Sequence, residues 1–130
     1  TTYSPSLIDI ISETNLVSNN LFAENLLKTI GKEITGVGSY DSARVAVNRF
    51  FESQGLSLVG YTQDDGSGLS RENYVSPRFF TKYYQMMMKS DTFAEYLESF
   101  PQPGEDRGTL KRVLKDLQLH FQDQILLQKW

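Results

Sequence analysis

The segment DDGSGLSRENYVSP, residues 64–77, combines residue types that could do chemistry. Glycines alternate with hydroxyl side chains and an arginine follows, so the segment could hold a nucleophilic serine, bind a phosphate or simply turn the chain. It is not a standard phosphate-binding loop, because no Gly-Lys-Ser/Thr follows the glycines. It also differs from the Gly-x-Ser-x-Gly nucleophile elbow, since Ser67 lies directly between Gly66 and Gly68. Its role therefore depends on residues elsewhere.

Three other groups offer weaker signals. His120 is the only histidine, and it stands among apolar neighbours without metal-ligand spacing, which disfavours a triad or a metal site. Glu105 and Asp106 could form an acid/base pair, but solvated loop carboxylates are far commoner. The methionines at 86–88 could line a ligand pocket, although their helical spacing with nearby aromatics favours core packing.

Composition limits the classes of protein to which the chain can belong. It has 130 residues, enough for one domain with a modest core, and a net charge of −3 from scattered charges. Nothing resembles a nucleic-acid or anionic-membrane footprint, and no apolar run reaches the roughly 20 residues that span a bilayer. The absence of cysteine excludes disulfides and Cys-based zinc or redox sites.

The periodicity of apolar residues predicts a mainly helical chain with one or two short strands. Ser76 and Pro77 form a typical helix start, and Asp91 is expected to cap a short helix that runs through Leu97. Gly31 and Gly55 are expected to end two earlier helices. The predicted helices cover residues 5–14, 20–31, 43–51, 77–87, 91–97 and 109–117, and a strand is predicted over 56–61.

A short Ser-x-Asn pattern, Ser18 to Asn20, lies between two of these helices. Alone it has little value, because Ser and Asn are common at helix N-caps. Three segments give it a context: TNLVSNNLFAENLLKTIG, DGSGLSRENYVSP and PGEDRGTLKR, in that order. Together they resemble the D-alanyl-D-alanine carboxypeptidases of the class C low-molecular-mass penicillin-binding proteins, which are serine peptidases.

The resemblance implies that residues 1–130 are an internal fragment, the helical part of an α/β penicillin-binding catalytic domain. Family members use Ser-x-x-Lys, Ser-x-Asn and Lys-Thr/Ser-Gly motifs. Ser18 and Asn20 match the second, so Ser18 would join the proton relay and Asn20 would bind the substrate backbone. No serine is followed three positions later by lysine, so the nucleophile is missing. At the expected place of the third motif, Trp130 follows Lys129 and the chain ends.

The resemblance also gives the glycine segment a candidate role. In the family it lines the cleft near the side chain of the stem peptide. If the segment is extended, Ser67, Leu69 and Arg71 face the same way. Leu69 would form an apolar wall and Arg71 would bind a carboxylate, such as that of diaminopimelate. In the alternative interpretation, Asp65 and Ser67 only organise a turn, and Arg71 pairs with a nearby acid.

The resulting hypothesis is part of a serine-type D-Ala-D-Ala carboxypeptidase/endopeptidase that cleaves peptidoglycan stem peptides through an acyl-enzyme. By resemblance it needs no metal or cofactor, binds β-lactams and acts in the periplasm or cell envelope of a bacterium. The chain alone is expected to be inactive, and its exposed apolar faces could make it self-associate. The alternative is a stand-alone, non-catalytic helical module that binds a peptidoglycan peptide or a protein partner.

Overall fold

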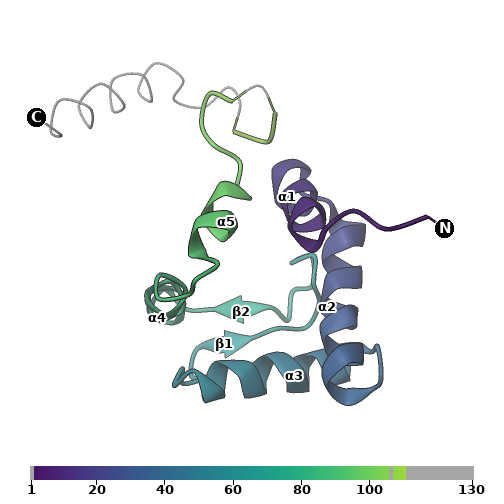
Figure 1. The fold of residues 1–130 in the computed structure, drawn as a ribbon. Helices are drawn as coiled ribbons and strands as arrows, with labels where there is room; N and C mark the ends of the chain where they lie inside the picture. The colour runs from purple at the N-terminus through teal and green to yellow at the C-terminus, as the bar shows by residue number, and fades with distance from the viewer. Residues whose placement is uncertain (1, 106, 111–130) are drawn as a thin grey trace, which may run out of the picture. The chain divides into compact units, whose positions relative to one another are not determined.

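The computed structural model describes residues 2–105 and 107–110, and within them the chain is mainly helical with two short strands (Figure 1). This agrees with the predicted fold class. The elements are α1 Leu7–Val17, α2 Asn20–Thr35, α3 Tyr40–Ser53, β1 Tyr61–Thr62, β2 Tyr74–Val75, α4 Pro77–Met87 and α5 Phe93–Glu98. The chain divides into two compact units. One unit comprises Thr1–Asn19 and Ala94–Trp130, and the other comprises Asn20–Phe93. No helix in the described ranges is long and apolar enough to cross a membrane.

In the unit of residues 20–93, α2 packs against α3. The prediction that Gly31 ends the second helix is wrong, because α2 continues to Thr35. Gly31 is buried, and a Cβ atom on it would lie 2.7 Å from the backbone nitrogen of Ala43. The glycine therefore permits a close approach of two helices rather than a helix end. Ser39 and Ser42 form a capping box that starts α3.

The strands pair as a minimal antiparallel hairpin, with Tyr61 opposite Val75. The predicted strand over 56–61 is wrong except at its last residue, because the preceding residues form a loop. Leu56 instead belongs to the core, where it clusters with Phe51 and Phe79. Its apolar character therefore reflects burial against α3 and α4 rather than strand pairing.

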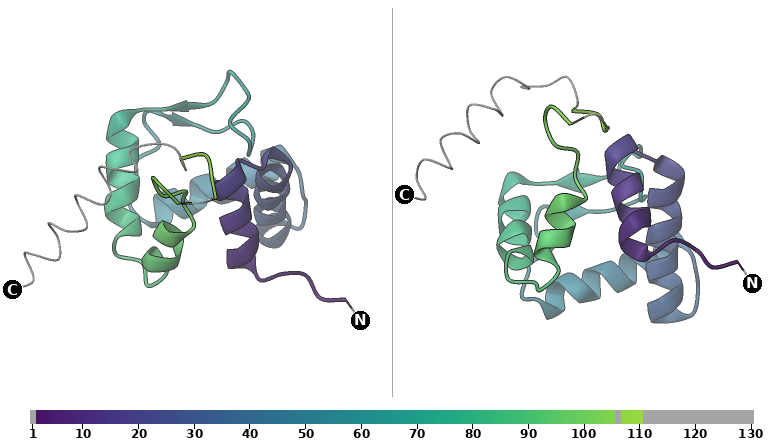
Figure 2. Two further views of the ribbon diagram at one scale, coloured as in Figure 1. Left: turned by 90° about the horizontal axis from the view of Figure 1, so that it is seen from above. Right: turned by 45° about the horizontal axis from the view of Figure 1, so that its top comes forward.

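The start of α4 is confirmed, because the Ser76 hydroxyl accepts a hydrogen bond from the Phe79 N–H at 3.2 Å and Pro77 occupies the first turn. The expected cap at Asp91 is wrong. The Thr92 N–H donates to the Ser90 hydroxyl oxygen at 3.3 Å, and α5 begins only at Phe93. Figure 2 shows that the hairpin runs from the loop of residues 63–73, beside α2, to the start of α4.

In the other unit, α1 is capped by Ser6 and extends three residues further than predicted, to Val17. The Asn15 amide donates to the buried Ser99 hydroxyl at 2.8 Å, and Arg107 pairs with Glu13 at 2.8 Å. These contacts join α1 to the segment that follows α5. Most of the helix predicted over 109–117 lies outside the described residues. Asp106, His120, Lys129 and Trp130 also lie outside them.

Candidate functional site

Ser18 forms the C-cap of α1 in a left-handed conformation, with φ 55° and ψ 52°. Its backbone N–H donates to the Thr14 carbonyl, and the residue is exposed. A residue with a Cβ atom pays a steric cost in this region, and such conformations cluster at functional sites. The Ser18 hydroxyl has no hydrogen bond to any described residue.

Asn20 is the first residue of α2 and is also exposed. Its side-chain amide carries one acceptor oxygen and two donor protons, the set that a peptide backbone requires. No described residue hydrogen-bonds to this amide. Each of the two named residues of the Ser-x-Asn pattern therefore has an exposed polar side chain with no hydrogen bond to a described residue.

One turn further along α2, Glu24 holds the glycine loop. The Gly66 N–H donates to one carboxylate oxygen at 3.1 Å, and the Ser67 N–H donates to the other, also at 3.1 Å. Gly66 lies so close to α2 that an added Cβ atom would be 2.5 Å from the Ala23 carbonyl oxygen. Glycine is thus required at residue 66 by packing, and the loop is held against the first turn and a half of α2.

Asp65 organises the loop from within. Its carboxylate accepts hydrogen bonds from the Gly68 N–H at 2.8 Å and the Ser70 N–H at 2.7 Å. It also accepts from the Ser67 hydroxyl at 3.2 Å and from the Asn73 amide at 2.8 Å. This pattern is an extended form of the Asx turn. The expected extended conformation is wrong here, because Gly68 has φ +79° and the segment is a tightly bonded turn.

Both carboxyl groups have lowered pKa values. Partial burial acts to raise the pKa of Glu24, but hydrogen bonds from the Ser67 side chain, the Gly66 and Ser67 N–H groups and the Tyr40 side chain outweigh it. Partial burial likewise opposes ionisation of Asp65, and the donors of its turn, led by the Asn73 amide, hold its pKa below the ordinary value. The loop is therefore built around two ionised carboxylates at neutral pH.

The predicted substrate-binding residues have different surroundings. Ser67 and Leu69 line an open concavity together with Tyr40, and Leu69 is 73% exposed. The hydroxyl of Ser67 is engaged in the turn, as the structural alternative predicted. Arg71 does not line this concavity, and it is exposed without an ion pair or hydrogen bond to any described residue. The pairing of Arg71 with a nearby acid, expected in that alternative, is thus not seen among the described residues.

Four of the ten residues that line the concavity are carboxylates, and one is an arginine. The guanidinium of Arg44 lies 3.0 Å from Asp41 and 4.0 Å from Asp64. These pairs are partly exposed and screened, so each stabilises the fold only slightly. The concavity of about 620 Å³ is lined by Glu24, Ser39, Tyr40, Asp41, Arg44, Asp64, Asp65, Ser67, Leu69 and Ser70.

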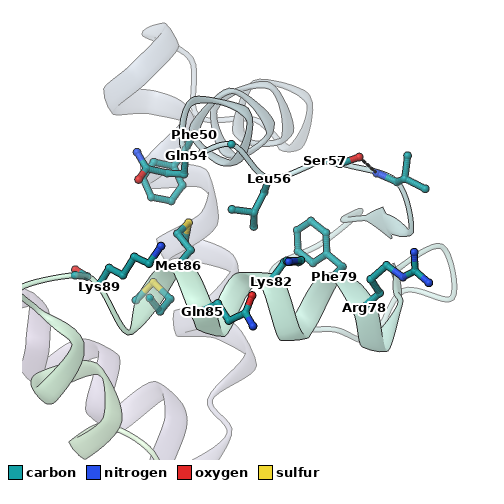
Figure 3. A pocket seen from close by; sticks show the side chains of 14 residues that line it. Phe50, Gln54, Leu56, Ser57, Arg78, Phe79, Lys82, Gln85, Met86 and Lys89 are labelled. Carbon is teal, nitrogen blue, oxygen red and sulfur yellow. Dashed lines mark hydrogen bonds between the residues drawn. The ribbon is translucent and has the colours of Figure 1, made fainter.

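A larger concavity of about 800 Å³ lies between the end of α3, the following loop and α4 (Figure 3). Leu56 and Phe79 form part of its apolar floor, and Arg78, Lys82 and Lys89 lie along its α4 side. It contains none of the residues predicted to act in catalysis or substrate binding. Met86 and Met87 of the methionine run line this concavity. Met86 also packs against the core cluster, as the packing interpretation of the run predicted.

The sequence model of the D-Ala-D-Ala carboxypeptidase 3 (S13) family matches residues 1–125. Because this match covers nearly the whole chain, the chain belongs to that family. The resemblance drawn from the three sequence segments is thereby confirmed.

Individual relatives support the same conclusion. The D-alanyl-D-alanine carboxypeptidase of Actinomadura sp. strain R39 is 40% identical over 73 residues, which are 56% of this chain and 14% of that protein. The D-alanyl-D-alanine carboxypeptidase DacB of Haemophilus influenzae is 28% identical over 108 residues, 82% of this chain and 22% of that protein. The chain thus spans about a fifth of the length of these relatives, or less.

A solved structure shows the same fold. The crystal structure of penicillin binding protein 4 from Haemophilus influenzae, complexed with a β-lactam, superimposes with a TM-score of 0.72 at 26% identity. The similarity covers 80% of this chain and 24% of that one. It agrees with the prediction that the chain has the fold of the helical part of a penicillin-binding domain.

Sequence reasoning missed two residues that shape the loop, Glu24 and Asn73. Glu24 lies 42 and 43 residues before its partners, and no periodic or turn signal links such distant positions. Asn73 had a usable signal, because Asp and Asn at the two ends of a glycine-rich segment often bond back to the turn. Its side-chain oxygen accepts from the Asp64 N–H at 2.8 Å and closes the base of the loop.

Proposed function

We propose that the chain is part of a serine-type D-Ala-D-Ala carboxypeptidase, also able to act as an endopeptidase, that cleaves peptidoglycan stem peptides through an acyl-enzyme. The observation that carries the proposal is that the Ser18 and Asn20 side chains are each exposed and each lack a hydrogen bond to a described residue, in a member of this family. The protein would act in the bacterial periplasm or cell envelope. β-Lactams would acylate it as substrate analogues.

In this mechanism the chain supplies proton transfer and substrate orientation, while a serine outside these 130 residues supplies the nucleophile. The Ser18 hydroxyl would pass a proton between that nucleophile, its lysine base and the leaving amine. One hydroxyl can do this because it both donates and accepts. Asn20 would hydrogen-bond the peptide backbone next to the scissile bond and so fix its position relative to the attacking oxygen.

Arg71 would bind the free carboxylate of a diaminopimelate side chain. Its guanidinium is exposed and has no ion pair among the described residues, so a bidentate contact would not have to break an existing one. Leu69 would offer an apolar surface to the aliphatic part of the same side chain. Ser67 would contribute through its backbone and the shape of the turn more than through its hydroxyl, which already bonds Asp65.

The test uses the full-length protein that contains this segment. Arg71→Ala is expected to lower kcat/KM for a diaminopimelate-bearing peptide by about 10–100-fold, the loss typical of a charged hydrogen-bonded contact, and to leave a minimal D-Ala-D-Ala substrate nearly unaffected. Equal losses on both substrates would show that Arg71 has a structural role only.

A second measurement concerns the chain alone. Because no serine in it belongs to a Ser-x-x-Lys motif, a fluorescent penicillin is expected to leave the isolated 130-residue chain unlabelled and to label the full-length protein. Stoichiometric labelling of the isolated chain would overturn the assignment of the nucleophile to another segment.

A further inference from the structure

Glu24 joins two parts of the candidate site that are distant in the sequence. It lies in α2, four residues after Asn20, and its two carboxylate oxygens accept the N–H groups of Gly66 and Ser67 at 3.1 Å each. Four residues is close to one helical turn, so Glu24 and Asn20 occupy the same side of α2. The carboxylate therefore fixes the start of the segment that carries Leu69 and Arg71 relative to α2, which begins at Asn20.

The packing around Gly66 makes this contact precise. The loop backbone lies directly against the Ala23 carbonyl, close enough that a Cβ atom at residue 66 would overlap it. The loop thus cannot move toward α2, and the two hydrogen bonds to Glu24 prevent it from moving away. Steric contact on one side and charge-assisted hydrogen bonds on the other hold a single position.

A carboxylate is the side chain that this geometry requires. Two neighbouring N–H donors face one group, and only a carboxylate offers two acceptor oxygens in one plane. A glutamine amide would accept one of the two N–H groups and present its own NH₂ donor to the other. One loop N–H would then face a donor and lose its hydrogen-bond partner. Leaving that N–H unpaired destabilises the loop because the group is partly shielded from water.

We propose that Glu24 is a positioning residue that determines specificity for the stem-peptide side chain, by holding the DGSGLSR loop at a fixed place on α2. The inference rests on the proposed function. Glu24 itself would not touch the substrate. It would act through the backbone of Gly66 and Ser67, and hence through the placement of Leu69 and Arg71.

The first test measures the loop itself, in the 130-residue chain. Glu24→Gln is expected to make the Gly66 and Ser67 amide protons exchange with solvent about tenfold faster, because a charged hydrogen bond is lost. The matched control is Glu33→Gln, on the same helix, where the side chain is exposed and has no hydrogen bond or ion pair to a described residue. Unchanged exchange in Glu24→Gln would overturn the proposal.

The second test measures specificity in the full-length protein. Glu24→Gln is expected to raise KM for a diaminopimelate-bearing peptide by about tenfold while changing KM for a minimal D-Ala-D-Ala substrate by less than about twofold. A loss shared equally by both substrates, with a lower unfolding midpoint, would mean that Glu24 only stabilises the fold, and would overturn the proposal.

The experiments distinguish a failure of the proposed carboxypeptidase function from a failure of the positioning role of Glu24. If the unsubstituted full-length protein cleaves neither substrate, the proposed carboxypeptidase function is wrong, whereas the exchange measurement on the chain still judges the Glu24 contact. If the unsubstituted protein cleaves both and Glu24→Gln preserves the ratio of their KM values, the carboxypeptidase stands and the positioning role is refuted.

Discussion

Replacing Gly66 by alanine tests the contact between the glycine loop and α2. The added methyl group would lie 2.5 Å from the Ala23 carbonyl oxygen and 2.8 Å from its carbon. These atoms belong to a helix backbone and cannot move aside as a flexible side chain would. An ordinary carbon–oxygen contact is about 3.4 Å, so the loop must retreat by roughly 0.9 Å.

That retreat removes the hydrogen bonds to Glu24. The N–H to oxygen distances of 3.1 Å would approach about 4 Å, beyond hydrogen-bonding range. Overpacking typically costs about 1–3 kcal/mol, and the loss of two partly exposed hydrogen bonds adds about 1 kcal/mol. We therefore expect Gly66→Ala to lower the free energy of unfolding of the chain by about 2–4 kcal/mol in urea denaturation.

Gly68→Ala is the control within the same loop. Gly68 has φ +79° and no atom within 4 Å of an added Cβ atom, so this substitution introduces only conformational strain of about 1–2 kcal/mol. Gly66→Ala should be the more damaging of the two. A smaller loss for Gly66→Ala than for Gly68→Ala would refute the close packing of the loop on α2.

Two further predictions concern packing and pH. Gly31→Ala should destabilise the chain by about 1–3 kcal/mol in the same assay, because its methyl group would overlap Ala43, whereas a glycine at an open helix position would gain about 1 kcal/mol from this change. The lowered pKa values of Glu24 and Asp65 mean that their stabilisation of the loop is present above the ordinary values of 4.5 and 3.8 and is lost as the pH falls through the lowered ones. In an NMR titration, carboxyl midpoints at or above those ordinary values would contradict the loop hydrogen bonds.

The parts of the fold that were predictable are those set by local signals. The Ser76–Pro77 helix start and the apolar periodicity of α3 each depend on residues within one or two turns. Gly31 shows the limit of such signals. Conformational freedom makes a glycine common at helix ends. Gly31 instead lies within α2, where it permits close contact with α3. A short stretch of sequence does not reveal such a contact between two helices.

The candidate site divides in the same way. Ser18 and Asn20 are predicted from the family resemblance and Arg71 from its place in a distinctive glycine string, and their roles stay predictions. The extended conformation expected for that string was wrong, since the bonds made by Asp65 bend it into a turn. Glu24 was missed because its hydrogen bonds to the Gly66 and Ser67 N–H groups form only when α2 and the loop lie together in the fold.

The measurement that tests the account most directly is the rate at which a fluorescent penicillin acylates the full-length protein with Ser18→Ala. A proton-relay hydroxyl contributes about 10²–10⁴-fold to such a step. Because Ser18 is exposed and its hydroxyl has no described partner, the unfolding midpoint should stay close to that of the unsubstituted protein. We predict at least about a hundredfold slower acylation. An unchanged acylation rate, with or without a lower midpoint, would contradict the catalytic role of the Ser-x-Asn motif in this chain.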